Sequence, residues 1–151
     1  MNVAEFNRNF PEFLQKMPNA NIVEVLQLKN SGWDQCYDSV RQWIINEGEK
    51  TNEKFLFHGS KEAGIIGIYN GGFDSRYFAR DGMYGRGAYF ADDSSKSHQY
   101  VQKCPTFNNL YCMFVCKVAL GKQEHCKQAA NGKLGPSPGY HSILGTAGSH
   151  T

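Results

Sequence analysis

The stretch Tyr84-Gly-Arg-Gly-Ala-Tyr-Phe-Ala91 joins a glycine-rich turn to a short apolar run, and Phe57-His-Gly-Ser60 closes another apolar run with a glycine. Aromatic and apolar residues bounded by glycines are typical of strands, so we expect strands over 54–57 and 88–91. The glycine pair of the first stretch is not a dinucleotide-binding loop, because the third glycine of that motif would fall at Phe90 and because the pair precedes a strand. Polar and aromatic side chains thus stand beside glycines at strand ends, where a flat ligand can approach the backbone.

The rest of the chain reads as short strands and short helices. Apolar residues alternate over 22–28, which predicts a strand, and recur at three-to-four spacing between Gly32 and Gly48, which predicts a helix. The remaining expectations are a helix over 63–69 closed by Asn70-Gly71-Gly72, a helix over about 95–102 capped by Asp92 or Ser94, a strand over 111–120, and loops over 73–87 and 121–139. Because strands outnumber helices and few are joined by a crossover helix, the pattern predicts an α+β fold with a mostly antiparallel sheet.

Size and charge exclude several classes of protein. With 151 residues, the chain is expected to hold one domain over 21–151 behind a short leader over 1–20. A net charge of +2 is too small for a dedicated binder of nucleic acids or membrane surfaces. The longest uncharged apolar run, at 110–116, is too short to cross a membrane. We therefore expect neither a membrane nor direct nucleic-acid binding.

The five cysteines bear on compartment and on metal binding. An odd number without a secretory signal favours a reducing intracellular compartment, cytoplasmic or nuclear, over a disulfide framework. The cysteines lack the C-x-x-C spacing of zinc sites, so we expect buried structural thiols and no metal.

The glycine-flanked residues together suggest a ligand. A glycine after the strand-terminal His58 leaves its N–H and C=O open to a planar amide, since no Cβ blocks the approach. A serine hydroxyl at the start of a nearby helix can supply a third hydrogen bond to that amide. Tyr89 and Tyr100 offer flat surfaces on which an aromatic ring can stack. An amide attached to an aromatic ring describes nicotinamide.

The order of these motifs resembles that of the catalytic domain of poly(ADP-ribose) polymerases, which are ADP-ribosyltransferases of the diphtheria-toxin-like type. The motifs that carry the resemblance are Phe57-His-Gly-Ser60, Gly72-Phe73, Tyr84 to Ala91, Ser95-Lys-Ser97 with Tyr100, Val118-Ala-Leu-Gly121 and Pro138-Gly-Tyr-His-Ser-Ile-Leu-Gly145. Within the family, Gly71-Gly-Phe-Asp74 is most similar to the tankyrase branch, although Phe107 stands where the tankyrase zinc loop has a histidine. The resemblance implies a split, mostly antiparallel β-sheet with short flanking helices, and NAD as co-substrate.

The resemblance also implies roles for individual residues. His58 resembles the triad member that bonds the 2′-hydroxyl of the nicotinamide ribose, and Gly59 would bind the carboxamide through its backbone. Ser97 would complete that clamp. Tyr89 resembles the second triad member, packing on the nicotinamide ring, with Tyr100 stacking on its other face. The positions that would line the adenosine half of NAD are Ser60, Gly67, Asp74 and Tyr77.

The third triad residue of the family follows the segment that ends at Gly145, in a strand that the printed sequence does not reach. We therefore expect a domain that lacks its final strands and is truncated at the C-terminus. The resemblance implies a protein ADP-ribosyltransferase that cleaves NAD at the nicotinamide–ribose bond and modifies a protein side chain. A carboxylate near the developing oxocarbenium charge speeds such a cleavage. The alternative is therefore a catalytically impaired NAD-binding pseudoenzyme or an interaction module. The choice between single transfer and chain growth stays open.

Overall fold

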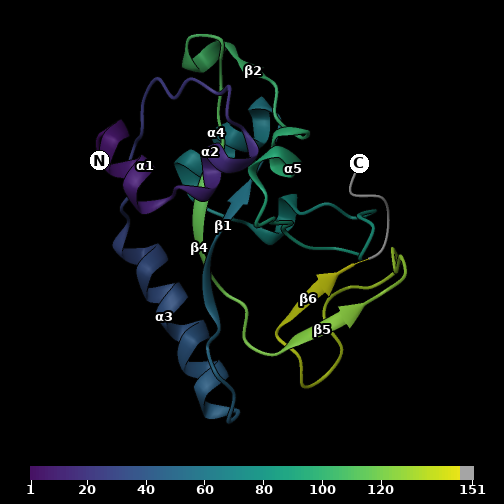
Figure 1. The fold of residues 1–151 in the computed structure, drawn as a ribbon. Coiled ribbons are helices and arrows are strands. Elements are labelled where there is room, and N and C mark those ends of the chain that lie inside the picture. The colour runs from purple at the N-terminus through teal and green to yellow at the C-terminus, as the bar shows by residue number, and fades with distance from the viewer. Residues whose placement is uncertain (147–151) are drawn as a thin grey trace. The chain divides into compact units, whose positions relative to one another are not determined.

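A computed structural model of the chain describes residues 1–146, and it shows short helices interspersed with short strands (Figure 1). In chain order the elements are α1 (Val3–Asn9), α2 (Glu12–Lys16), α3 (Ser31–Asn46), β1 (Glu53–His58), α4 (Glu62–Gly71), η1 (Ser75–Tyr77), α5 (Ser94–His98), β2 (Lys103–Cys104), η2 (Pro105–Phe107), β3 (Leu110–Tyr111), β4 (Phe114–Ala119), β5 (Gln123–Cys126) and β6 (Ser142–Gly145). The predicted α+β class is confirmed. Positions 147–151 of the expected domain lie outside the described residues.

The strands form two-stranded sheets. Strand β1 pairs with β4, and β2 pairs with β3 in the antiparallel sense that the sequence predicts. Strands β5 and β6 lie side by side in Figure 1, and they pair in parallel from Gln123 opposite Ser142 to Cys126 opposite Gly145.

The chain divides into two units, and each unit takes three separate segments of the sequence. The first unit consists of Met1–Asn30, Leu56–Asn70 and Phe90–Cys116. The second consists of Ser31–Phe55, Gly71–Tyr89 and the described part of Lys117–Thr151. The segments alternate along the chain, so each unit depends on contacts between residues far apart in sequence.

Aromatic side chains fill the interior of the first unit. Phe57 of β1 is 2% exposed, and its ring centroid lies 5.8 Å from that of Phe13 in α2. The Phe13 ring in turn meets Phe6 of α1 at 5.8 Å, edge to face, an arrangement that aromatic rings favour. Helix α1 begins with a capping box between Asn2 and Glu5, which satisfies backbone groups that the helix cannot pair internally. Residues expected to form a leader thus contribute to the interior of this unit.

A charged cluster joins α3 to β1 in the second unit. The Tyr37 hydroxyl donates to Glu53 at 2.8 Å, the Nε of Arg41 lies 2.8 Å from the same carboxylate, and the Lys117 ammonium lies 3.7 Å away. The hydrogen bond from Tyr37, reinforced by the Arg41 charge, holds the pKa of Glu53 below its ordinary value. Burial and the nearby carboxylate raise the pKa of Tyr37. Ile44, one turn after Arg41 on the same face of α3, is fully buried.

The strand expected over 22–28 is wrong. The structure gives this segment no regular secondary structure, and Val23 and Leu26 are 61% and 57% exposed. Alternating apolar residues make a stable strand only where a neighbouring strand accepts their backbone hydrogen bonds. None of the strands within residues 1–146 pairs with this segment.

Four other boundaries differ from expectation. The segment 88–91 contributes a single bridge, Ala91 opposite Phe57, in place of a strand. The long strand over 111–120 is divided into β3 and β4, and the helix expected over 95–102 ends at His98. The expected loop over 121–139 contains β5, whose partner β6 begins 16 residues after β5 ends and therefore could not be found from local pattern. By contrast, the helices predicted between Gly32 and Gly48 and over 63–69 are confirmed as α3 and α4.

Candidate functional site

The end of β1 brings His58 to the edge of the first unit's interior. The backbone of Phe57 exchanges two hydrogen bonds with Ala91, at 2.7 and 2.9 Å. These bonds fix the strand end immediately before His58. The imidazole then packs against the Phe90 ring, with centroids 5.3 Å apart. His58 is thus half-buried, with an aromatic ring packed on one side of its imidazole.

Gly59 lies against the backbone of Ser97. A Cβ built on Gly59 would overlap the Ser97 carbonyl oxygen and would lie 3.0 Å from Cγ1 of Val101. A side chain at 59 would therefore force a backbone segment to move. The Ser97 side chain is 4% exposed, and its hydroxyl donates to the Phe57 carbonyl at 3.1 Å. The predicted clamp residues 59 and 97 are thus neighbours in the first unit.

Helix α5 presents Ser97, and its first turn is fixed by two serines and an aspartate. The carboxylate of Asp93 caps the helix, accepting from the backbone N–H of Ser95 at 2.9 Å and from its hydroxyl at 2.6 Å. These bonds hold the pKa of Asp93 below its ordinary value. The fully buried Ser94 donates to the Phe13 carbonyl at 2.7 Å, which ties α5 to α2. The expected caps Asp92 and Ser94 are wrong by one position, because Asp93 is the residue whose side chain reaches the N–H two positions on.

The other predicted residues of this unit lie on its surface. Tyr100 is 59% exposed and donates its backbone N–H to the Ser97 carbonyl at 3.1 Å. The Ser60 hydroxyl covers Gly64, the third residue of α4, so closely that a Cβ there would overlap it. Gly67 lies on the exposed side of α4 with open space where a Cβ would point.

Tyr89 belongs to the second unit, within a turn formed by residues 82–89, which we call the tyrosine turn. Its hydroxyl donates to the Gly85 carbonyl at 2.6 Å and accepts from the Tyr84 N–H at 3.0 Å. Gly85 has φ +92°, a conformation that glycine adopts without strain, and its N–H closes the turn onto the Gly82 carbonyl at 2.9 Å. The Tyr89 hydroxyl therefore points into its own turn, and the ring is 37% exposed.

The two predicted adenosine-side residues of the second unit are the N-cap and the last residue of η1. Asp74 caps this short helix, and its carboxylate pairs with the Arg76 guanidinium at 2.7 Å. The hydrogen bonds from Arg76 hold the pKa of Asp74 below its ordinary value and raise that of Arg76. Tyr77 is 82% exposed, with the Arg76 guanidinium 5.7 Å from its ring centroid.

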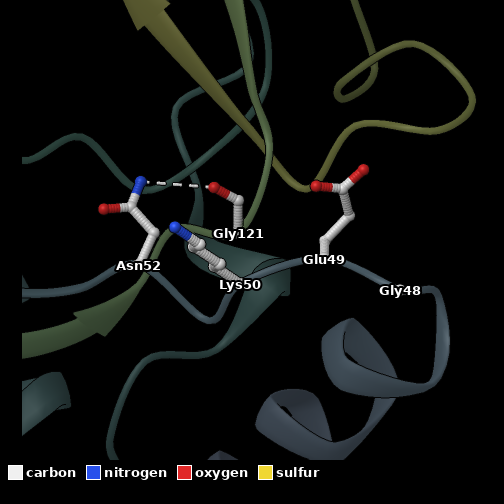
Figure 2. A pocket seen from close by; sticks show the side chains of 5 residues that line it. All are labelled: Gly48, Glu49, Lys50, Asn52 and Gly121. Atoms are coloured by element: carbon white, nitrogen blue, oxygen red, sulfur yellow. Dashed lines mark hydrogen bonds between the residues drawn. The ribbon is translucent and has the colours of Figure 1, made fainter.

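The second unit also has a polar pocket that contains none of the predicted residues. Figure 2 shows its lining, where the side chains of Glu49, Lys50 and Asn52 follow α3 and the backbone of Gly121 lies opposite. The Asn52 amide donates to the Gly121 carbonyl at 3.2 Å. The described residues bring no group of three His, Cys, Asp or Glu side chains together as metal ligands. Within the same residues, no helix has the length and apolar character to span a membrane.

The cysteines only partly follow the expectation of buried thiols. Cys104 is fully buried and Cys36 is exposed, whereas the others are half-buried. Burial raises the pKa of Cys116 to about 12.

Sequence reasoning missed the residues that support the predicted ones. Phe90 packs on His58, a contact that its place in an expected strand does not predict. Asp93 is the cap of α5, and the signal for it is an aspartate followed by Ser-Ser at a helix start. The contact of Phe13 with Phe57 joins residues 44 positions apart, for which the local sequence carries no signal.

Comparison with known proteins gives the family. Residues 4–151 match the family described as the poly(ADP-ribose) polymerase catalytic domain. The chain is 30% identical to human protein mono-ADP-ribosyltransferase PARP3 over 139 residues, which cover 84% of this chain and 26% of that protein. It is 31% identical to mouse protein mono-ADP-ribosyltransferase PARP12 over 121 residues, 77% of this chain and 15% of that protein. It is 39% identical to the Caenorhabditis elegans poly [ADP-ribose] polymerase tankyrase over 74 residues, 47% of this chain and 3% of that protein.

The chain belongs to the poly(ADP-ribose) polymerase catalytic domain family. It spans about a quarter or less of the length of these curated relatives. The resemblance inferred from the sequence motifs is confirmed, including the relationship to a tankyrase.

Proposed function

We propose that the protein is an NAD-dependent protein ADP-ribosyltransferase. It would cleave NAD at the nicotinamide–ribose bond and transfer ADP-ribose to a protein side chain. Family membership supports the reaction class. The structural observation that best supports NAD binding is the contact between Gly59 and Ser97. It would act inside the cell, in the cytoplasm or nucleus, without a metal.

The chemistry of the first unit fits a carboxamide. A planar amide needs one acceptor for its N–H groups and one donor for its oxygen, and the backbone of a glycine supplies both without steric hindrance. The single hydroxyl hydrogen of Ser97 is engaged by the Phe57 carbonyl, so the Ser97 oxygen offers lone pairs to a further N–H donor. In this proposal, Gly59 and Ser97 hold the nicotinamide carboxamide.

His58 and the tyrosines would supply orientation. An imidazole held against Phe90 loses little freedom when it bonds a ribose hydroxyl, which favours the geometry needed for bond cleavage. Tyr100, three residues after Ser97 and exposed, offers its ring for stacking on an aromatic ligand. Tyr89 would take the role of the second triad member by resemblance.

The alternative is an NAD-binding module with little or no catalysis. The Asp74 carboxylate already accepts hydrogen bonds from Arg76, which leaves it less available to an adenosine hydroxyl and would weaken NAD binding. A module of this kind would bind NAD weakly and release no nicotinamide.

Nicotinamide release from NAD by the purified chain separates the two proposals. We expect release that is abolished in His58→Ala, with thermal stabilisation by NAD retained in part. Thermal stabilisation without release would favour the binding module. Neither release nor stabilisation, in this chain and in any longer natural form of it, would refute both.

A further inference from the structure

The tyrosine turn does not stand alone in the second unit, because a later segment of the chain holds it from one side. The N–H of Arg86 donates to the Lys133 carbonyl at 2.9 Å, and the N–H of Ala130 donates to the Met83 carbonyl at 2.7 Å. Gly85 lies so close to Lys133 that a Cβ would overlap the Lys133 carbonyl oxygen. The position of the turn is therefore fixed by the backbone at 130–133.

That backbone is in turn held by one carboxylate. Glu124, on β5, accepts from the Lys133 ammonium at 3.0 Å and from the Ser137 hydroxyl at 2.8 Å through one oxygen. Its other oxygen accepts from the Ser137 N–H at 2.7 Å. Lys133 also donates to the Ser137 hydroxyl oxygen at 3.1 Å, which completes a three-residue network. Hydrogen bonds to a charged group are about twice as strong as those between neutral groups, so this network is a firm anchor.

The network is half-buried rather than exposed. The side chains of Lys133 and Glu124 are 25% and 18% exposed. The hydrogen bond from the Ser137 N–H, followed by that from Lys133, lowers the pKa of Glu124 to about 2. The carboxylate therefore stays charged throughout the pH range of an enzyme assay.

We propose that Glu124 is a positioning residue for Tyr89, acting through Lys133 and the tyrosine turn. The chain of contacts runs from the β5–β6 sheet to Glu124, then to Lys133, then to the turn that holds the Tyr89 hydroxyl at both Tyr84 and Gly85. The effect on NAD rests on the proposed function, in which Tyr89 packs on the nicotinamide ring. The anchoring of the tyrosine turn by Glu124 does not depend on the proposed function.

Steady-state kinetics of nicotinamide release test the effect on NAD. In Glu124→Gln we expect the KM for NAD to rise by up to about tenfold, because a displaced Tyr89 ring packs less well on the nicotinamide ring and one aromatic contact contributes up to about tenfold in affinity. A merely structural role would lower the folded fraction, which reduces apparent kcat and leaves KM unchanged. Glu49→Gln is the matched control. It makes the same change in the same unit, at a carboxylate with no side-chain hydrogen bond or ion pair to the residues described, and its KM should not move.

Epistasis shows whether the effect passes through Tyr89. In a Tyr89→Ala background, Glu124→Gln should raise KM no further, because the ring that it positions is gone. An unchanged KM in the single variant, or an equal rise in both backgrounds, would overturn the proposal.

Hydrogen exchange tests the anchor independently of activity. Glu124→Gln should accelerate exchange in the peptide covering 82–89, where the Arg86 amide is bonded to Lys133. Glu49→Gln should leave that peptide as protected as in the wild type. Unchanged protection in Glu124→Gln would refute the anchoring itself, whereas faster exchange in a chain that releases no nicotinamide would support the anchor and refute only the proposed function.

Discussion

Gly59→Ala probes the closest backbone approach in the first unit. The added Cβ would overlap the Ser97 carbonyl oxygen, and it would lie 2.9 Å from the Ser97 carbonyl carbon and 3.0 Å from Val101 Cγ1. Two of these three atoms are backbone, which cannot rotate away as a flexible side chain can. Overpacking of this kind costs about 1–3 kcal/mol. Since 1 kcal/mol shifts the Tm of a chain of about 150 residues by about 2–4 °C, a 2 kcal/mol cost lowers it by about 4–8 °C.

Thermal unfolding followed by circular dichroism measures this shift, with Gly67→Ala as the matched control. Gly67 is the same residue type in the same unit, but it has open space in the direction of a Cβ and lies inside α4. Replacing a helix glycine by alanine stabilises by up to about 1 kcal/mol, so its Tm should stay the same or rise. If Gly59→Ala unfolds at the wild-type temperature, the contact between Gly59 and Ser97 of α5 is not as close as described. The reasoning about the carboxamide clamp would then fail with it.

Two further experiments test the N-terminal cap of α5 and the burial of the thiols. Asp93→Ala removes a helix cap and should cost about 1 kcal/mol in urea unfolding at pH 7, and a cost near zero would contradict the cap. Because its hydrogen bonds hold the pKa of Asp93 below the unfolded value of about 4, the carboxylate stabilises the fold above that pH and the effect is lost as the pH falls through the folded pKa. The variant's stability should therefore depend less on pH in the acid range than the wild type's. In iodoacetamide labelling at pH 8 read by mass spectrometry, Cys36 should react well before Cys116, whose thiol has a pKa of about 12, and equal rates would argue against that burial.

The sequence predicted correctly the helices and strands that have a clear apolar pattern or a terminating glycine within their own residues. The helix between Gly32 and Gly48 has an apolar periodicity of its own, and the run ending at Phe57 is closed by His-Gly. The same reasoning failed over 22–28, where the alternation is as clear but no described strand pairs with it. A strand is stable only when it pairs with a neighbouring strand, and the alternation of apolar residues in one segment does not show whether such a neighbour is present.

The residues of the candidate site also fall into two groups, those with a local sequence signal and those placed by long-range contacts. His58, Gly59 and Ser97 could be named from the sequence because glycine and polar residues at strand and helix ends carry a distinct local signature, and the structure brings Gly59 and Ser97 together. The network of Glu124 with Lys133 could not be named, because the polar segment 121–139 looks like any exposed loop until β6 pairs with β5. The hydrogen bonds of this network form only when distant segments pack together, so no periodic pattern in the sequence predicts them.

The alternation of segments between the two units has a consequence for synthesis of the chain on the ribosome. The third segment of the first unit is Phe90–Cys116, and it supplies Ala91, which pairs with Phe57, together with Ser97. The first unit therefore cannot close until its third segment has been made, by which point two segments of the second unit have already been synthesised. Both units must wait, partly formed, for distant residues, which is a situation that slows folding and leaves apolar surface exposed to chaperones. For the same reason, no single cut in the gene would yield either unit as a continuous polypeptide.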